Sequence, residues 1–410
     1  MSSNISIKNV GASSQNIAAG NGPQSNLNGT GTQNNYYGGT VHPMSSDTHH
    51  AEGLVSNRTR PSRREDFRIA LICALPLEYD AVALQFDEFW DEDGEEYGRA
   101  PGDNNNYTTG RIGNHNVVLT ILPNMGKTAA AGAAANFRCS YSRLRLALLV
   151  GICGGAPIIG TDEAVLGDVI ISRNLIQYDI GRQFPNAFVM KDTLEDNLGR
   201  ANKDIRSLVA SFETELGRER LRKKAGEYLS NLQATATRKR RRYGYRYLGV
   251  VEDKLFPATY QHKHRAPQSC DVCEGETERH CEEAAQASCA ELNCDQTQLL
   301  SRDILEVKMR LELNEMQCPD IFVGRIASGD TVVKSGKHRD QLARELNVVA
   351  FEMEGAGAWD EVPCIVIKGI CDYADSHKNK KWQPFAAATA SSVMKAVLGR
   401  YATTDRPTSA

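Results

Sequence analysis

The sequence predicts an α/β domain with a largely parallel or mixed central sheet, preceded by a polar N-terminal segment. Two observations support this fold class. From Phe67 onward, short apolar runs alternate with turns and helical patterns, as is typical of α/β domains. The 410-residue chain is also 41% hydrophobic, which is enough to bury a substantial core. We therefore expect one large α/β domain over residues 67–402.

The expected strands are apolar runs with the length and composition of buried strands. They lie at residues 69–74, 117–122, 146–150, 169–171, 321–323, 348–350 and 364–367. Helical patterns are expected at residues 77–82, 128–137 and 391–401. Between about residues 191 and 312 the alternation stops, and a charged helical pattern over 207–232 precedes a cysteine-rich stretch. Because strands resume afterwards, we interpret residues 191–312 as an insertion within the domain.

Residues 1–46 differ from the rest of the chain, with one charged side chain and many Asn, Gly, Ser, Gln and Thr residues. Glycine and glutamine recur nine residues apart, at Gly11, Gly20, Gly29, Gln15, Gln24 and Gln33. Such a polar segment buries too little apolar surface to fold alone, which predicts a disordered tail. Repeated Gln and Asn side chains also stack into amide ladders between chains, so an amyloid-type assembly motif is the alternative. Residues 47–66 are expected to form a polar linker.

The composition excludes several classes of protein. With 48 basic and 51 acidic residues the net charge is −3, so no overall attraction to nucleic acid or anionic membranes is expected. No apolar run approaches the ~20 residues that cross a bilayer, and the first residues lack the apolar core of a signal peptide. Eleven cysteines without an export signal suggest reduced thiols. We expect a cytoplasmic protein that binds neither membrane nor nucleic acid.

Three acidic residues that follow predicted strands are the candidate catalytic groups. Glu78 lies one turn into the helix after the first strand, Glu354 follows strand 348–350, and Asp372 follows strand 364–367. Open α/β sheets bind ligands at the carboxyl ends of their strands. These side chains are therefore expected to share one site.

Six segments resemble, in the same order, motifs of the nucleoside phosphorylase and nucleosidase superfamily. They are residues 69–78, 124–130, 151–155, 326–330, 352–355 and 370–375. The chain most resembles the methylthioadenosine/S-adenosylhomocysteine nucleosidase branch, and the resemblance covers residues 68–397 apart from the insertion. It implies a three-layer α/β/α sandwich with a mixed central sheet.

The resemblance also implies roles for individual residues in cleaving an N-glycosidic bond. Asp372 corresponds to the acid that hydrogen-bonds the purine at N7, and an aspartic acid there favours adenine. Glu354 corresponds to the carboxylate that binds the ribose hydroxyls, and Met353 to the side chain that packs against the ribose. Glu78 corresponds to the base that activates water. Further substrate contacts are implied for residues of the matched glycine and ribose segments, namely Gly126, Lys127, Gly154 and Ser328.

Departures from the superfamily pattern bear on the reaction type. Phosphorylases of the superfamily bind phosphate with an arginine and a serine where this chain has Leu149 and Ile152, so water is the favoured nucleophile. A phosphate-dependent purine nucleoside phosphorylase is the alternative. A non-catalytic nucleotide-sensing assembly domain is a second alternative, which the intact carboxylates disfavour. The aromatic residue that stacks on the base is replaced by valine, and Tyr178 or Phe184 is the expected substitute.

Basic residues flank the segments of the expected site and suggest the chemistry at the 5′ end of the substrate. They are His262, His264, Arg265, Arg325 and Lys334. Clustered Lys, Arg and His side chains bind polyphosphates through charge-assisted hydrogen bonds. This variant of the domain resembles those of fungal NOD-like receptor proteins and of immune effectors that cleave ATP to adenine and ribose 5′-triphosphate. The resemblance implies an adenine nucleotide nucleosidase, with ATP as the expected substrate, acting as an immune or cell-death effector.

The insertion is rich in cysteine, and the sequence allows several interpretations of it. Cys270 and Cys273 have the spacing of a zinc-binding pair and Cys281 follows, but a second close pair is missing. A structural metal, local disulfides and free thiols are all compatible with this pattern, and no cofactor is expected in the catalytic site. By analogy with the superfamily we expect a homo-oligomer, and the N-terminal repeat suggests a receptor partner.

Overall fold

Nine strands of the computed structural model form one mixed sheet, in the order β12-β11-β8-β13-β5-β1-β4-β3-β2. The strands are β1 (Ile69–Cys73), β2 (Glu88–Phe89), β3 (Thr108–Ile112), β4 (His115–Ile121), β5 (Leu146–Gly155), β8 (Val169–Gln177), β11 (Ile321–Ser328), β12 (Ala350–Glu352) and β13 (Cys364–Asp372). Neighbours are parallel within β4-β1-β5-β13 and within β8-β11-β12, whereas β8–β13, β3–β4 and β2–β3 are antiparallel. The predicted α/β class and mixed sheet are confirmed.

The structure describes residues 60–402 except 93, 95, 96, 192, 194, 267, 268 and 275–278. The predicted tail, residues 1–46, and the linker up to residue 59 lie outside this range. The last residues of the predicted linker contact the domain, because the Arg60 guanidinium donates to the carbonyl of Trp90 and the Tyr97 hydroxyl donates to the carbonyl of Pro61 at 2.9 Å. The packed part of the chain therefore begins before Phe67.

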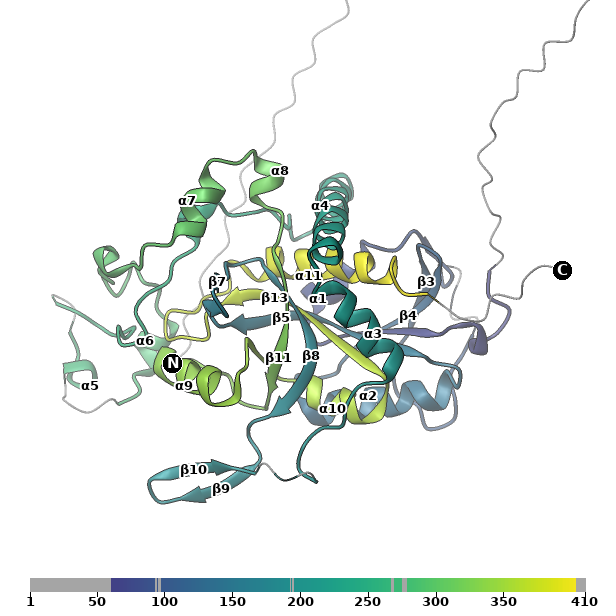
Figure 1. Cartoon of the computed structure of the whole chain (residues 1–410), viewed down its shortest axis with the longest axis horizontal. Helices are drawn as coiled ribbons and strands as arrows, with labels where there is room; N and C mark the ends of the chain where they lie inside the picture. Colours follow the sequence, from purple (N-terminus) through teal and green to yellow (C-terminus); the bar gives the residue numbers. More distant parts are fainter. Residues whose placement is uncertain are drawn as a thin grey trace, which may run out of the picture. The chain divides into compact units, whose positions relative to one another are not determined.

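Helices cover both faces of the sheet, which explains the continuous apolar character of its strands. Alternate residues of β1 point to opposite faces, so Ala70 and Ile72 belong to one hydrophobic cluster, and Ile69 and Leu71 to the other. The first face carries α2 (Lys127–Ser140) and α10 (Gly355–Glu361), and the second carries α1 (Pro76–Ala83), α3 (Lys203–Phe212), α4 (Glu215–Arg238) and α11 (Gln383–Leu398) (Figure 1). This is the expected three-layer sandwich.

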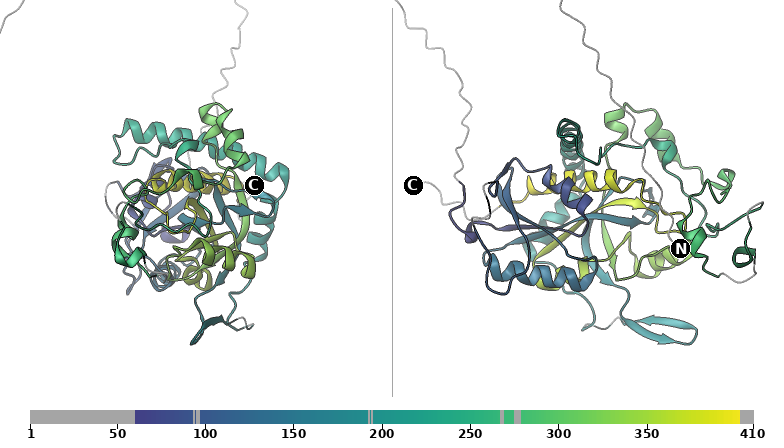
Figure 2. Two further views of the ribbon diagram at one scale, coloured as in Figure 1. Left: turned by 90° about the vertical axis from the view of Figure 1, so that its left-hand side faces the viewer. Right: turned by 180° about the vertical axis from the view of Figure 1, so that it is seen from behind.

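The remaining elements complete the described part of the chain. They are β6 (Ile158–Ile159), β7 (Asp162–Glu163), β9 (Gly181–Phe184), β10 (Ala187–Met190), α5 (Asp271–Glu274), α6 (Glu282–Gln286), α7 (Asp303–Met309), α8 (Leu313–Met316), α9 (Gly336–Leu346) and three 3-10 turns at Arg64–Asp66, Val250–Glu252 and Gln296–Gln298. The β9–β10 hairpin projects from the domain (Figure 1 and Figure 2). Its strands were not expected from the sequence.

The predicted insertion lies between β10 and β11 and has two parts. Its first part forms two helices, α3 and α4, where one charged helical pattern was expected over 207–232. The break occurs at Thr214, whose side chain accepts a hydrogen bond from the backbone N–H of Gly217 and caps α4. Both helices bury apolar residues in the second hydrophobic cluster, and α4 packs on α11. The cysteine-rich part forms a separate small cluster around Phe256.

Helix α11 begins at Gln383 and ends at Leu398, so it is longer at its N-terminus than the pattern over 391–401 suggested. Pro384 stands in its first turn, where a missing N–H removes no helical hydrogen bond. In residues 60–402, as far as the structure describes them, no helix combines the length and the apolar character needed to span a membrane.

The contact between β13 and α11 leads to a prediction on stability. A methyl group at Gly369 of β13 would collide with the carbonyl oxygen of Ala386 in α11. We expect Gly369→Ala to lower the free energy of unfolding by about 1–3 kcal/mol, because helix and strand must move apart. Gly132→Ala is the control, since this exposed position in α2 has open space and the change should stabilise the helix by ~0.5–1 kcal/mol. Urea denaturation measures both, and equal effects would contradict the prediction.

Candidate active site

A cavity of about 730 Å³ lies at the carboxyl ends of β1, β5, β12 and β13. Its lining includes Glu78, Glu354 and Asp372, which come from distant parts of the sequence. The sheet topology brings these three side chains to one place, because the ends of neighbouring strands meet at the same edge. Residues 285–288 of the insertion form another part of the wall.

Backbone amides of two strand ends hold the carboxylate of Glu78. Its Oε2 accepts hydrogen bonds from the N–H groups of Ala74 and Leu75, both at 2.9 Å, and its Oε1 accepts one from Ile152 at 2.8 Å. Gly151 is required here, because a methyl group at that position would collide with the Glu78 carboxyl. The side chain is therefore fixed at the base of the cavity.

Burial also changes the acidity of Glu78, which is 2% exposed. Loss of solvation raises the pKa of its carboxyl, the charge of Lys368 opposes this rise, and the nearby Glu354 carboxylate adds to it. A carboxylate with a raised pKa accepts a proton more readily near neutral pH than an exposed one. Glu78 therefore has the properties of a general base.

Lys368 lies at the centre of a buried charge cluster. Its Nζ is 2.9 Å from Oε2 of Glu354 and 3.6 Å from Oε2 of Glu352. Burial disfavours the charged ammonium, but the neighbouring Glu354 and Glu352 carboxylates raise the pKa of Lys368, so it stays charged. Burial raises the pKa of the Glu352 carboxyl, which also accepts hydrogen bonds from the backbone N–H groups of Glu354 and Gly355. Glu352 and Lys368 thus hold Glu354 in place.

Asp372 ends β13 and points into the cavity from a buried position. Its Oδ1 accepts a hydrogen bond from the backbone N–H of Ala374 at 2.9 Å, and its Oδ2 lies 3.2 Å from Nζ of Lys378. A Cβ atom at Gly154 would lie 3.1 Å from Oδ1, so a glycine there lets β5 approach the carboxyl closely.

Two buried arginines brace the loop after Asp372 through Tyr373. Arg302, from the insertion, donates to the Tyr373 hydroxyl at 2.6 Å and to Asp253 at 2.9 Å. Arg339 donates to the Tyr373 carbonyl at 2.8 Å. The orientation of Asp372 therefore depends on both the insertion and α9.

The residues proposed from the sequence fall into three groups: those that line the cavity, those that support it and those that contact other groups. Those that line the cavity are Glu78, Gly154, Lys334, Met353, Glu354 and Asp372. Three others support it from outside its lining. Lys127 pairs with Asp179 at 2.6 Å, Gly126 packs on Asp330 with φ 110°, and the Ser328 hydroxyl accepts a hydrogen bond from the backbone N–H of Ala356 at 2.9 Å.

Four of the expected phosphate-binding residues, three in the insertion and one in β11, contact other groups. The rings of His262 and His264 face cysteine side chains. Arg265 stacks on the ring of Tyr260 and bonds backbone carbonyls. Arg325 donates to the carbonyl of Leu346 at 2.8 Å and lines a different cavity, which also includes Asn347. None of these four side chains belongs to the lining of the cavity that contains Glu78.

Several cavity residues received no role from the sequence. They are Glu352, Lys378 and the aromatic Phe351 in the lining, together with Lys368, which is buried behind it against Glu352 and Glu354. For Lys368 the sequence did contain a signal, namely a lysine within the apolar run of β13. Lysine is almost never buried unless it is paired, so this position indicates a buried acidic partner. Tyr178 contacts Phe351 edge-to-face, whereas Phe184 is 49% exposed on the β9–β10 hairpin, so Phe351 is the aromatic residue that lines the cavity.

Comparison with known proteins gives relatives of two kinds. An NLR-like protein of Hyaloscypha variabilis is 31% identical over 346 residues, which are 83% of this chain and 30% of the relative. An aminodeoxyfutalosine nucleosidase of Helicobacter pylori is 35% identical over 83 residues, which are 18% of this chain and 36% of the relative. The chain thus spans about a third of the length of either relative.

Solved structures with a similar fold include the futalosine hydrolase of H. pylori, with 14% identity and a TM-score of 0.43 over 82% of this chain and 98% of that one. A 5′-methylthioadenosine/S-adenosylhomocysteine nucleosidase of S. pneumoniae has 16% identity and a TM-score of 0.45 over 81% and 98%. The family model described as the phosphorylase superfamily matches residues 68–403. Because this match includes the whole sheet and every residue of the cavity, the protein belongs to the phosphorylase superfamily.

Proposed function

We propose that the protein hydrolyses the N-glycosidic bond of adenine nucleotides, with ATP as the preferred substrate. The observation that supports this most directly is the meeting of Glu78, Glu354 and Asp372 in one cavity. Cleavage of this bond develops positive charge on the ribose and negative charge on the departing base, and it requires a nucleophile at the anomeric carbon. Three carboxyl groups with different surroundings meet these requirements.

Each carboxyl group has a distinct part in the proposed reaction. Asp372 transfers a proton to N7 of the leaving adenine, and Lys378 lies beside its Oδ2 to stabilise the resulting carboxylate. Glu354 stabilises the ribosyl cation, since its buried carboxylate is held in place by Lys368. Glu78 removes a proton from the attacking water. Met353 lines the cavity beside these groups and packs against the ribose.

Water is the proposed nucleophile rather than phosphate. Leu149 is fully buried in the core, and Ile152 presents an apolar side chain to the cavity. Neither side chain can bind a phosphate anion, which requires donors or a cation. The products are then free adenine and ribose that keeps its 5′ substituent.

The preference for a nucleotide rests on lysines at the cavity. Lys334, Lys378 and Lys380 belong to its lining, and Lys334 and Lys380 are exposed. Exposed ammonium groups in the lining of a cavity attract phosphate oxygens. Lys334 and Lys380, rather than the histidines of the insertion, are the groups that would contact a 5′-triphosphate.

We also infer a role for the activity. The similarity to an NLR-like fungal protein and the N-terminal repeat support a cytoplasmic immune or cell-death effector, which acts as a homo-oligomer and is recruited by a receptor through that repeat. Removal of adenine nucleotides would then be the response to recruitment.

The proposed roles of the carboxyl groups predict the effect of replacing them. Glu78→Gln and Asp372→Asn are each expected to lower kcat for adenine release from ATP by roughly 10²–10⁴, because each removes one proton-transfer group. Chromatography of the products measures free adenine. Glu361→Gln is the control, since this residue on α10 forms a partly exposed ion pair with Arg138. The absence of adenine from every adenine nucleotide with wild-type protein, with or without phosphate, would refute the proposed activity.

The charge cluster predicts a pH dependence. Because the pKa of Glu78 is raised, kcat/KM is expected to increase with pH as this carboxyl ionises, at a pH above the ordinary range of a glutamate. Lys368→Met removes the cation that opposes this rise, so the pKa of Glu78 increases and the acid limb moves to higher pH. A pH–rate profile measures the shift, and circular dichroism verifies the fold. An acid limb that stays in place or moves to lower pH would contradict the assignment of Glu78.

The lysines predict how the enzyme distinguishes nucleotides from nucleosides. Lys334→Ala and Lys380→Ala are each expected to raise KM for ATP about tenfold and leave KM for adenosine unchanged, since a hydrogen bond to a charged group contributes about 1.5–3 kcal/mol. Lys239→Ala, at the exposed end of α4, is the control. Equal effects on ATP and adenosine would show that these lysines do not bind phosphate.

A further inference from the structure

Four side chains of the insertion meet around one point near α5. They are His264, Cys270, Cys273 and Cys281, which we call the local cluster. The Nδ1 atom of the histidine lies 3.3, 3.5 and 3.7 Å from the three sulfur atoms, in the order of the chain. All four candidate ligand atoms lie within 4.8 Å of one another.

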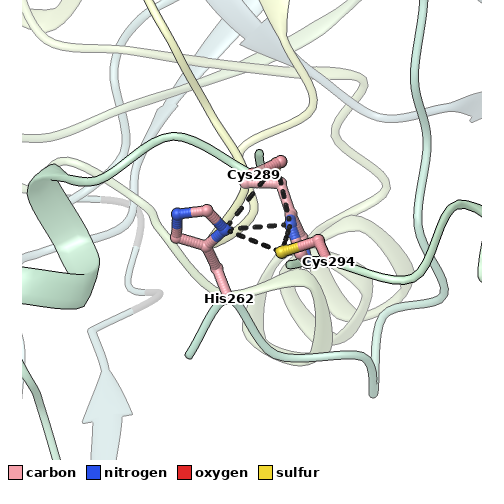
Figure 3. Close-up of side chains that lie close together, drawn as sticks. His262, Cys289 and Cys294 are labelled. Atoms are coloured by element: carbon pink, nitrogen blue, oxygen red, sulfur yellow. Dashed lines mark hydrogen bonds between the residues drawn. The ribbon is translucent and has the colours of Figure 1, made fainter. Parts of the chain in front are cut away.

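A second group of four contains residues from two distant parts of the chain. They are His262, Cys289, Cys294 and His377, which we call the bridging cluster. The two Nδ1 atoms are 3.2 Å apart, and the sulfur–nitrogen distances are between 3.5 and 4.0 Å. Figure 3 shows the Nδ1 atom of His262 pointing toward Cys289 and Cys294.

We propose that each cluster binds one Zn²⁺ ion, so that the insertion is a two-zinc module. In a tetrahedral site with Zn–N bonds of ~2.0–2.1 Å and Zn–S bonds of ~2.3 Å, ligand N and S atoms are about 3.5 Å apart and two N atoms are about 3.4 Å apart. The distances in both clusters fit this geometry. Soft thiolates with imidazole in tetrahedral sets of four select zinc over Mg²⁺ or Ca²⁺, which prefer oxygen ligands.

The histidines of the bridging cluster are oriented as metal ligands. The Nε2 atom of His262 lies 2.9 Å from the carbonyl oxygen of Ala287, and that of His377 lies 2.9 Å from the carbonyl oxygen of Tyr260. Each Nε2 therefore carries the proton and donates it to a carbonyl, which leaves the lone pair of Nδ1 free to bind a cation. Such a second hydrogen bond is typical of zinc-binding histidines.

Disulfides are a poorer explanation of these contacts. All eleven cysteines, each within the described part of the chain, are free. A histidine in the middle of three thiols, or two histidines facing two thiols, would not result from disulfide formation. Each proposed ion has four protein ligands, and none of the eight lines the cavity, which is the arrangement of structural rather than catalytic zinc.

The proposed bridging zinc connects the insertion to the loop that follows Asp372. His377 follows Asp372 in this loop, and the backbone N–H of His262 donates to the Ser376 hydroxyl at 3.1 Å. Cys289 directly follows residues 285–288, which form part of the cavity wall. The ion would therefore hold this wall against the loop, and His377 is a positioning residue. This last step rests on the proposed function, whereas zinc binding does not.

Metal analysis of the purified full-length chain by mass spectrometry tests the zinc sites directly. We expect two zinc ions per chain in the wild type, one in Cys273→Ser, one in Cys289→Ser and none in the double variant. Cys139→Ser and His280→Ala are controls that keep two, because Cys139 is an exposed cysteine and the His280 ring contacts Glu282 outside both clusters. Less than one zinc in the wild type, or two in both single variants, would overturn the proposal.

Cobalt substitution provides a measurement that does not depend on the folding of variants. Wild-type protein loaded with Co²⁺ should show thiolate-to-cobalt charge-transfer bands and the intense d–d bands of tetrahedral cobalt. The bands should correspond to two ions per chain and disappear when Zn²⁺ is added. The absence of charge-transfer bands would exclude cysteine ligation and overturn both sites.

The rate of adenine release distinguishes the role of the bridging cluster from that of the local cluster. Cys289→Ser is expected to lower kcat/KM for ATP at least tenfold more than Cys273→Ser, because only the bridging ion holds the loop with Asp372. Equal losses in the two variants would overturn the positioning role. If the wild type contains two zinc ions but releases no adenine from any adenine nucleotide, the proposed function is refuted and the zinc sites stand.

Discussion

The ion cluster around Lys368 is the constraint on which the site depends. A lone ammonium group inside a sheet would be strongly destabilising, so this lysine requires the carboxylates of Glu352 and Glu354. The carboxylates require the lysine in turn, because those of Glu78, Glu352 and Glu354 would repel one another without a cation among them. Lys368 is opposite Gly151 in the β5–β13 pairing, and Gly151 is the residue that makes room for Glu78. The register of β5 and β13 therefore places the lysine and the Glu78 carboxylate close to each other.

The sequence predicted the sheet well because most of its strands are buried on both faces. Continuous apolar runs such as those of β1 and β13 have few alternative explanations. Short or exposed strands lack this signal, which is why β2 and the β9–β10 hairpin were missed. Strand β3 was missed as well, because its sequence TTGRI contains a single apolar residue besides glycine. The break between α3 and α4 was missed because it depends on a single capping residue, Thr214.

Side-chain partners were harder to predict than the strands. The acidic residues at or just after the ends of β1, β12 and β13 were found because position in an α/β sheet is informative. The His262 and His264 side chains were read as phosphate ligands, since basic residues near a site favour that interpretation. The structure places them against cysteines, and one of their partners, His377, is more than a hundred residues away in the chain. No spacing rule links residues at such a separation, so only the folded chain reveals the group.

Strand β12 has hydrogen-bonded neighbours on both sides, because Ala350 and Phe351 pair with β11 and also with the end of β5. The sheet therefore curls back on itself at this end, and the polar backbone groups that a terminal strand would present are already used there. The opposite end of the nine-stranded sheet is β2, which has two residues. Pairing between copies of the domain through either end of this nine-stranded sheet is consequently disfavoured, because few backbone groups are available there.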